Sequence, residues 1–371
     1  MQEHTSVSGR TRASDLKQMT PNPIRVAGRY SARATTPADG PEIVALMADA
    51  GLQPNVKPQE MHWKYWQQHE GWPGPRSYVV SDGRTILAHA AVVPLSCERE
   101  GHRLKAGHLI DWAARAGQPG TGIMLMKHVA ALTDALIGVG GSDASLKLLP
   151  HVGFRQCGLA TGYVRALRPL RLLNDTSRPS WRLLPRMARS AIWRFAAPRP
   201  DRHPWQVRRV VADQLHAFAP AFTKSRGAVT AFERSESELR YILGCPIVPM
   251  ELFVLEQAGR PRGYFILAFV SCQARLVDCS VDSDAPADWR ILIQCAVHQA
   301  MQRRAMAELA TWGGDPVLCA CLEECGFHPR FTAPIFVRSR KAIDLAAAAL
   351  RVHMLDSDAA YLHGEEQLLW A

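Results

Sequence analysis

The sequence has no long apolar run. None of its stretches approaches the ~18 consecutive apolar residues that a helix needs to cross a bilayer. The first residues, MQEHTSVSGRTRASDLKQMTPNP, also lack the apolar centre of a secretory signal. We therefore predict a cytoplasmic protein whose residues 1–27 form a disordered leader.

The sequence also lacks a cysteine framework. Its nine cysteines are scattered and share no paired spacing, which favours a reducing compartment over a fold held by disulfides. Cys319, Cys321 and Cys325 lie close together, but no second pair of cysteine or histidine residues lies at metal-ligand spacing. We interpret these three as core residues and predict no metal.

Acidic residues are scarce in one segment. From Arg165 to Arg209 there are twelve arginines and two acidic residues, so this segment has a net charge of +10, as large as that of the whole 371-residue chain. Its six prolines are typical of a connection between domains, and the chain length predicts two or three domains. Contact with nucleic acid or an anionic membrane surface through this segment stays an alternative.

A basic amphipathic helix is predicted inside this connection, from Trp181 to Phe195. Leu184, Met187, Ala191 and Ile192 fall on one side of it. We interpret it as a solvated linker helix that packs its apolar side on a domain.

The stretch from His108 to Leu125 reads HLIDWAARAGQPGTGIML. An apolar strand, His108 to Ala114, leads into a glycine-rich turn, Gly117 to Gly122, and a helix begins at Ile123. Backbone N–H groups at a helix N-terminus have no partner within the helix, and glycines let them approach an anion closely. The pattern is therefore typical of a phosphate site.

Strands and helices alternate around this stretch. Ser81 to Arg84 is a hairpin turn between two apolar runs, and Leu52 to Trp72 is an aromatic segment that we interpret as a core helix or the wall of a cleft. The remaining predicted elements of this part are a strand at 30–35, a helix from 39 to 47, a helix at 123–136, a strand at 135–139, a helix at 143–149 and a strand pair at 156–167.

Four segments in this order resemble the GNAT family of acyltransferases. They are YSARATTPADGPEIVALMADAG, SYVVSDGRTILAHAAVVP, HLIDWAARAGQPGTGIML and SDASLKLLPHVGF, within residues 28–170. The resemblance implies an α/β fold with a mixed sheet that binds an acyl-CoA. The match departs from the family in two places. Gly117 stands at the usual Gln/Arg position, with Gln118 one place late, and Ser142 and Leu149 replace the usual Asn and Tyr.

The second part of the chain repeats this order. Glu251 to Val270 repeats the hairpin, and Cys325-Gly326-Phe327 parallels Val152-Gly153-Phe154 at an offset of 173 residues. In place of the glycine-rich turn the second copy has DSDAPADW, whose three aspartates would repel a pyrophosphate. We predict two GNAT-like domains, at 28–170 and 210–341, joined by a basic linker at 171–209. The second domain is degenerate and is followed by a tail at 342–371.

The resemblance also implies which residues hold the donor. Amides of the strand after Asp111 would bind the thioester and the pantetheine arm, and the glycine-rich turn would bind the pyrophosphate. The predicted donor-binding set is Trp112, Ala113, Ala114, Gly117, Gln118, Pro119, Gly120, Thr121, Gly122, Ile123, Ser142 and Ser145.

The candidate bases lie on the same strand. Asp111 and His108 are the catalytic candidates, and strict alternation puts them on opposite faces of the strand. A structural role for Asp111 is weighed equally, and His89 and His62 are more distant alternatives. Ser145 or water could protonate the leaving thiolate.

We predict an acyl-CoA-dependent N-acyltransferase with acetyl-CoA as the default donor and a small-molecule amine as the acceptor. The alternative is a non-catalytic protein with the GNAT fold that binds CoA or serves as a scaffold. Aminoacyl transfer to cell-wall precursors and acetyl transfer to thiol-sugar amines also use tandem domains of this kind, but no residue here selects either. The sequence predicts no oligomeric state.

Overall fold

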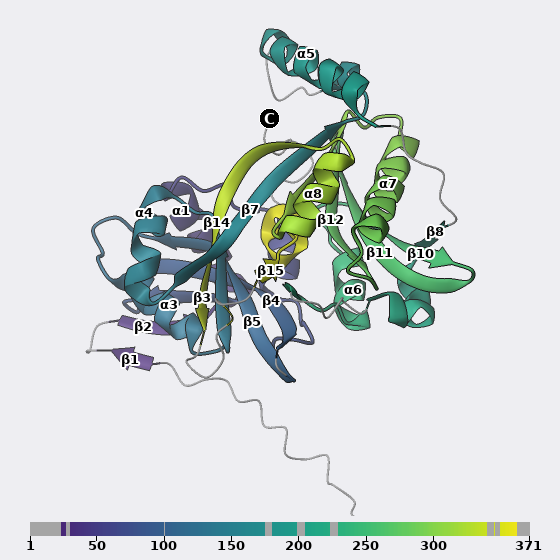
Figure 1. Cartoon of the computed structure of the whole chain (residues 1–371). Coiled ribbons are helices and arrows are strands. Elements are labelled where there is room, and N and C mark those ends of the chain that lie inside the picture. The colour runs from purple at the N-terminus through teal and green to yellow at the C-terminus, as the bar shows by residue number, and fades with distance from the viewer. Residues whose placement is uncertain are drawn as a thin grey trace, which may run out of the picture.

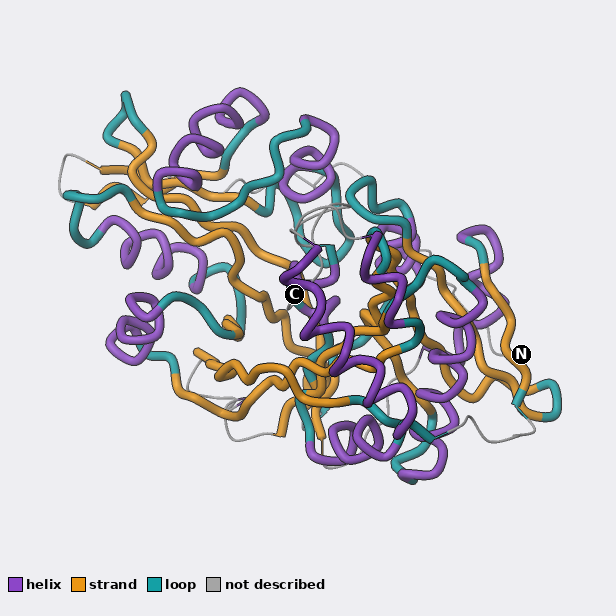
Figure 2. The backbone as a smooth tube through the Cα atoms, turned by 90° about the horizontal axis from the view of Figure 1, so that it is seen from above, coloured by secondary structure: helices purple, strands orange, loops and turns teal. Residues whose placement is uncertain are grey.

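The computed structural model describes residues 24–26, 30–99, 101–174, 180–198, 205–222, 229–339, 345 and 349–361. In this part of the chain, one mixed sheet of 13 strands runs through the molecule in the order β1-β2-β3-β4-β5-β6-β14-β7-β13-β12-β11-β10-β8. Seen from above, the strands run through the middle of the molecule, with helices along both sides (Figure 2). The mixed α/β class predicted from the sequence is therefore confirmed.

The first half, residues 30–166, lies on the left of Figure 1. Its strands are β2 (Tyr30–Ala34), β3 (Ser77–Ser81), β4 (Ile86–Arg99), β5 (His102–Ala114), β6 (Ala135–Val139) and β7 (Arg155–Ala166). Its helices are α1 (Gly40–Asp49), α2 (Pro58–Met61), a π-helix (His62–Trp66), α3 (Thr121–Ala130) and α4 (Asp143–Leu148).

The second half, residues 206–339, lies on the right of the same view (Figure 1). Its strands in the large sheet are β8 (Gln206–Val210), β10 (Met250–Gln257), β11 (Arg260–Val270), β12 (Gln273–Val281), β13 (Glu308–Gly313) and β14 (His328–Ser339). Its α-helices are α6 (Glu236–Leu243), α7 (Pro286–Gln302) and α8 (Pro316–Glu324), with a 3₁₀ helix at Ala212–Phe222, and α5 (Ser180–Ala196) lies between the halves in sequence.

The repeated order of elements predicted from the sequence is present. The β3–β4 and β10–β11 hairpins are antiparallel pairs, and α3 and α7 each follow the strand that comes after the hairpin, β5 or β12. Gly153 and Gly326 end the equivalent helical segments, and both have left-handed φ angles, 90° and 79°. A side chain at either position would be strained, which explains why glycine stands at both.

The two halves exchange their last strands. β7 pairs with β13 of the second half, whereas β14 crosses back to pair with β6 of the first half. The two exchanged strands also pair with each other, and they cross the centre of the molecule (Figure 1). The segment predicted as a strand pair at 156–167 is therefore a single strand, because both of its partners come from the second half.

Structure extends into segments predicted to lie outside the two domains. Ile24–Val26, in the predicted leader, forms β1 against β2, and β8 lies in the predicted basic linker. These strands have three and five residues, too short for their alternation to be recognised. The rest of the leader, 1–23 and 27, lies outside the described residues, as do 175–179 and 199–204 of the linker.

The C-terminal segment, residues 349–361, is part of the core. Its strand β15 (Ala349–Arg351) pairs in parallel with β9 (Val229–Ala231), and two 3₁₀ turns follow, Met354–Asp356 and Asp358–Ala360. Leu350, Met354 and Tyr361 are buried in a cluster shared with both halves. This part of the predicted tail is thus packed between the halves.

Candidate functional site

An opening lies between β5 and β6. These parallel strands pair only from Ala106 to His108, opposite Ala135 to Ile137, and then separate because β6 continues along β14. A cavity of about 850 Å³ fills the space beyond. It is lined by residues 50–53, 109–114, 138–142, 144, 145, 148 and 149 and by Asp358.

A β-bulge shapes one wall of this cavity. Ala91 of β4 pairs with Ile110 and His89 pairs with Ala113, so Asp111 and Trp112 share one place in the ladder. Asp111 has a left-handed φ of 50°, which is uncommon for a residue with a side chain. Bulges of this kind bend a strand and redirect its side chains.

The bulge changes the face on which Asp111 lies. Ile110 packs in a cluster with Tyr65, and the Tyr65 hydroxyl donates a hydrogen bond of 2.6 Å to Asp111. His108 faces the C-terminal segment, to which Asp111 is also linked through Lys64. The expectation that His108 and Asp111 face opposite ways is therefore wrong, because the extra residue breaks the alternation on which it was based.

Asp111 and Asp358 share one buried cation. The Lys64 ammonium lies 2.8 Å from Oδ2 of Asp111 and 3.4 Å from Oδ2 of Asp358. The side chain of Lys64 is 2% exposed, whereas that of Asp358 is 17% exposed and reaches the cavity. Two carboxylates and one ammonium leave this cluster with a net charge of −1 when all three are ionised.

Burial and charge shift the three pKa values. Burial lowers the pKa of Lys64, but the two carboxylates outweigh it and the pKa is raised. Burial raises the pKa of Asp111, but the Lys64 charge and the hydrogen bonds from Lys64 and Tyr65 outweigh it and the pKa is lowered. For Asp358, burial and the Asp111 charge together raise the pKa despite Lys64. Asp358 is thus the more basic carboxylate.

A π-helix, His62–Trp66, supplies the cation. Gln67 N donates to His62 O, the i→i+5 bond that marks this rare helix type, which is often found at functional sites. Lys64 and Tyr65 point to Asp111, whereas His62, Trp63 and Trp66 line a second, apolar cavity of about 840 Å³. The sequence predicted a core helix or the wall of a cleft for this aromatic segment and gave no role to Lys64. The available signal was a lone lysine among aromatic residues, which needs an anionic partner once buried.

Two buried histidines hold the surrounding backbone. Nδ1 of His89 donates to the carbonyl of Asp111 at 2.9 Å and so fixes the bulge. Nδ1 of His108 donates to the carbonyl of Asp356 at 2.9 Å and so fixes the turn before Asp358. Burial lowers the pKa of each to about 4, and both rings are therefore neutral at pH 7. His108 is not among the residues that line the cavity between β5 and β6.

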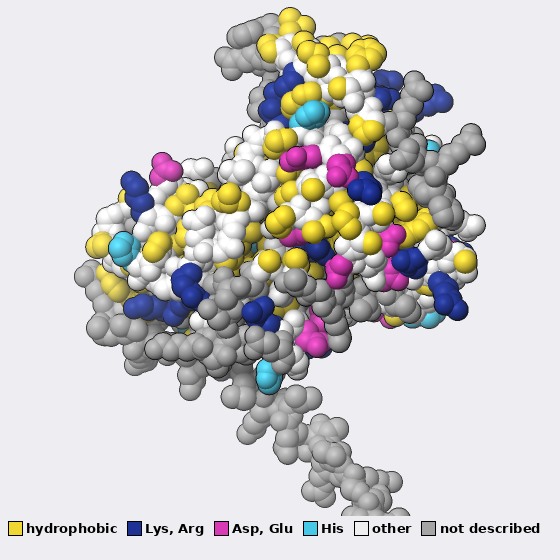
Figure 3. Space-filling view, in the orientation of Figure 1, with side chains coloured by type: hydrophobic (Ala, Val, Ile, Leu, Met, Phe, Trp, Pro, Cys, Tyr) yellow, Lys and Arg dark blue, Asp and Glu magenta, His cyan; other side chains and the backbone are white. Residues whose placement is uncertain are grey.

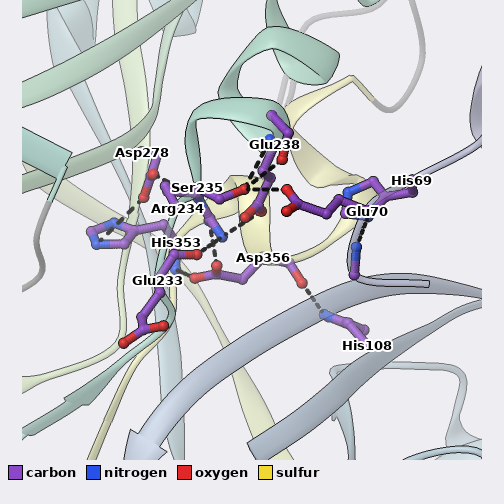
Figure 4. A network of polar contacts seen from close by, with 12 residues as sticks. His69, Glu70, His108, Glu233, Arg234, Ser235, Glu238, Asp278, His353 and Asp356 are labelled. Atoms are coloured by element: carbon purple, nitrogen blue, oxygen red, sulfur yellow. Dashed lines mark hydrogen bonds and ion pairs between the residues drawn. The ribbon is translucent and has the colours of Figure 1, made fainter. Parts of the chain in front are cut away.

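Arg234, which belongs to the second half, also anchors the C-terminal segment (Figure 4). It donates to Asp278 of β12 at 2.9 Å and to Asp356 at 2.5 Å, and all three side chains are at most 1% exposed. The Tyr264 hydroxyl donates to Asp278 at 2.7 Å. Asp358 is thus held two residues beyond a fully buried ion pair.

The glycine-rich turn lies beside the cavity. Gly117 and Gly120 have left-handed φ angles of 78° and 85°, and a Cβ at either position would point into open space. A Cβ on Gly122 would lie 3.4 Å from Ala114 and from the Trp112 ring, both in the cavity wall. The first N–H groups of α3 face this turn without helical partners. The arrangement fits a diphosphate, because anions bind at such helix starts.

The remaining predicted donor residues lie on these two features. Ser142 caps α4 by accepting from Ser145 N at 3.3 Å, and both serines line the cavity. The Tyr30 hydroxyl donates to the Gln118 side chain at 3.2 Å, and the Thr121 hydroxyl donates to the Gln118 carbonyl at 2.9 Å. These two hydrogen bonds hold the turn in place. The structure thus places the predicted donor residues along the cavity or in the adjoining turn.

Among the described residues, no group of three or more His, Cys, Asp or Glu is arranged to hold a metal ion. The thiols of Cys321 and Cys325 point to main-chain carbonyls of α7. Both side chains are about 1% exposed, and they pack in the core of the second half.

Solved structures share this architecture at low identity. Saccharomyces cerevisiae N-myristoyltransferase with bound myristoyl-CoA matches with a TM-score of 0.59 at 10% identity, over 93% of this chain and 86% of that one. The chain has the GNAT fold.

Solved structures of two bacterial proteins also resemble this chain. A probable N-acyltransferase from Enterococcus faecalis has a TM-score of 0.55 at 13% identity, over 84% of this chain and 73% of that one. A GCN5-related N-acetyltransferase from Sphaerobacter thermophilus has a TM-score of 0.51 at 16% identity, over 87% of this chain and all of that one. No family model and no curated protein matches the sequence. The resemblance noted in the sequence is thus confirmed at the level of the GNAT fold, in a tandem arrangement.

Proposed function

We propose that the chain is an N-acyltransferase that moves the acyl group of an acyl-CoA, with acetyl-CoA as the default donor, to an amine. One observation carries the proposal. The sheet opens between β5 and β6 at a bulged aspartate, beside a glycine-rich helix start and against a buried carboxylate pair. The GNAT fold of N-acyltransferases supports the reaction class.

The donor would lie along the free edge of β5. Leu109 to Ala114 bond to β4 on one side, and beyond His108 they have no pairing with β6 on the other. Backbone groups on this edge can bind the amides of a pantetheine arm as a neighbouring strand would. The amides from Gly120 to Ile123 would hold the pyrophosphate. Trp112, with its indole N–H buried and without a hydrogen-bond partner, lies between the two regions.

The acceptor would approach the carboxylate pair. The net charge of −1 on Lys64, Asp111 and Asp358 favours binding of an ammonium group in this partly buried place. Asp358 is the better base, because its pKa is raised and it reaches the cavity, whereas Asp111 is held ionised by Lys64. We therefore propose that Asp358 removes the proton and that Asp111 positions Lys64.

The reaction proceeds by direct transfer. The ammonium gives a proton to the Asp358 carboxylate, and the neutral amine nitrogen attacks the thioester carbonyl carbon. The C–N bond forms, the C–S bond breaks, and the thiolate takes one of the two protons left on the nitrogen, through Ser145 or water, while the amide keeps the other. Holding the amine and thioester together supplies much of the rate enhancement in such a site.

Donor binding can be tested by isothermal titration with acetyl-CoA. We expect a Kd on the order of 1–100 μM, about −5.5 to −8 kcal/mol, that is lost in Gly120→Glu. Gly101→Glu is the matched control, because Gly101 also has a left-handed φ and open surroundings but lies at the other end of β5. Absence of binding to the parent protein would refute the donor site.

Turnover requires a separate measurement. CoA release should be followed with a panel of small amines at saturating acetyl-CoA. Binding of acetyl-CoA without CoA release for any amine would favour the non-catalytic alternative over the enzyme.

A further inference from the structure

Helix α5 docks on the protein through a polar face. Arg186 forms a 2.6 Å ion pair with Glu308, and Arg194 donates to the carbonyl of Leu167. The ring of Trp193 stacks on that of His328, with the ring centroids 4.2 Å apart. Met187 also packs inward, against a small cluster of buried residues. The helix is thus held by cations, one aromatic ring and Met187.

The opposite face of α5 is apolar and turned outward. Leu184, Ile192 and Phe195 are 59%, 68% and 90% exposed, and with Ala188 they lie within an arc of about 80° around the helix. This reverses the expectation that Leu184 and Ile192 pack on a domain. Among the eight large apolar residues exposed in the described chain, four lie between residues 170 and 195. Hydrophobic atoms gather over α5 at the top of Figure 3.

Arginines flank the exposed apolar residues in sequence. Leu170, 73% exposed, stands between Arg168 and Arg171, and Phe195 follows Arg194. Arg168 donates to the carbonyls of Met301 and Arg303. Burial lowers the pKa of Arg168, and the charges of Arg171, Arg194 and Arg304 lower it further, so these cations lie close together. Lysine and arginine atoms flank the apolar patch in Figure 3.

We propose that the outer face of α5, made of Leu184, Ala188, Ile192 and Phe195, docks on the surface of an anionic phospholipid bilayer. The apolar side chains would enter the boundary between headgroups and acyl chains, and the arginine cluster would contact the phosphates. No described helix has the length and apolarity to span a membrane, and the proposed contact lies in the surface plane.

Charge and apolarity together select this partner. A nucleic acid would neutralise the arginines but leave three large apolar side chains in water. A second copy of the chain docking by this face would cover the apolar residues but oppose two like-charged clusters. An anionic membrane would both cover the apolar side chains and neutralise the arginines.

The test is sedimentation of the full chain with vesicles of phosphatidylcholine alone or with phosphatidylglycerol at about a third of the lipid. We expect binding to the anionic vesicles. Ile192→Asp/Phe195→Asp should weaken it at least about tenfold, and Arg171→Gln/Arg304→Gln should weaken it several-fold per charge. Leu159→Asp/Val211→Asp is the matched control, because these residues are also half exposed but lie elsewhere.

Several results would overturn the proposal. One is a failure of the parent chain to sediment with anionic vesicles, and another is unchanged binding of Ile192→Asp/Phe195→Asp. Self-association that this variant abolishes, without vesicle binding, would identify a second copy as the partner. Binding to duplex DNA without vesicle binding would identify a nucleic acid. Because the substituted side chains are exposed, unchanged acetyl-CoA binding by each variant checks that the fold is intact.

Discussion

The two halves of the molecule contain the same kind of buried cluster. In the first, Asp111 of β5 meets Lys64, Tyr65 and Asp358, and in the second, Asp278 of β12 meets Arg234, Tyr264 and Asp356. Each aspartate lies beside a β-bulge in the strand that precedes α3 or α7. A duplicated fold has thus kept an aspartate, a cation, a tyrosine and a carboxylate from the C-terminal segment at both places.

The clusters differ in what surrounds them. The second is sealed, and its guanidinium is fully buried between aspartates. The first contains a lysine, and its Asp358 faces a cavity. At the start of α7 the glycines are missing, and the ring of Trp289 is buried there with its N–H on the Ser283 carbonyl. The second half thus has a closed, buried ion cluster where the first half has one that borders a cavity.

The largest expected effect is on stability, from Arg234→Met. Loss of this cation leaves Asp278 and Asp356 buried without their shared partner, which we expect to lower the free energy of unfolding by about 3–5 kcal/mol. Lys64→Met should cost less, about 1–3 kcal/mol, because Asp358 can reach water in the cavity. Urea denaturation of both variants measures the difference, and equal losses would contradict the contrast between sealed and open clusters.

The next effect is on the reaction. Asp358→Asn should lower kcat by about 100-fold or more, the usual size of a general-base contribution, with little change in the Kd for acetyl-CoA. Asp356→Asn is the matched variant, two residues away and bonded to Arg234. It should lower the unfolding free energy and leave the kcat of the folded fraction nearly unchanged. If the two variants exchanged these effects, the assignment of the base would be wrong.

A smaller effect is a pH dependence of the unfolding free energy that arises in the first half. The folded-state pKa of His108 is about 4, below its ordinary value of 6.5, so the folded protein resists its protonation. Its stabilising contribution is complete above pH 6.5 and is lost as the pH falls from there to 4. Between pH 7 and pH 5 the unfolding free energy should fall by about 2 kcal/mol on this account. His108→Gln should remove that part of the pH dependence, and urea denaturation at both pH values checks it.

The smallest effect is expected at the start of α7. Asp282 and Asp288 pair with the partly exposed Arg262, and exposed pairs contribute little. Asp282→Asn/Asp288→Asn should change the unfolding free energy by less than about 1 kcal/mol and leave the binding of one acetyl-CoA per chain unaltered. A second bound acetyl-CoA in the parent chain would show that the second half also retains a donor site.

The sequence predicted the elements of each half well because local patterns determine them. The hairpin at Ser81 to Arg84, the turn at Gly117 to Gly122 and the glycine ends at Gly153 and Gly326 all reflect backbone constraints within a few residues. Trp112 to Ala114, which the resemblance to the GNAT family assigned to the donor, line the cavity.

The features that the sequence did not predict depend on contacts between residues that are distant in sequence. Lys64 and Asp358 are 294 residues apart, and no periodicity links them. The bulge at Asp111 depends on the register with β4 and on the His89 ring, which a strand pattern does not reveal. The exchange of β7 and β14 was missed for the same reason, because either partner choice satisfies the alternation of these strands.

The strand exchange has a consequence for synthesis of the chain. β6 has no partner on its outer edge until β14, at residues 328–339, has been made. At about 5–20 residues per second, the ribosome needs on the order of 10–30 s to advance from the end of β7 to that strand. During this interval the nascent first half exposes an open sheet edge at β6, which β14 covers once residues 328–339 have been made.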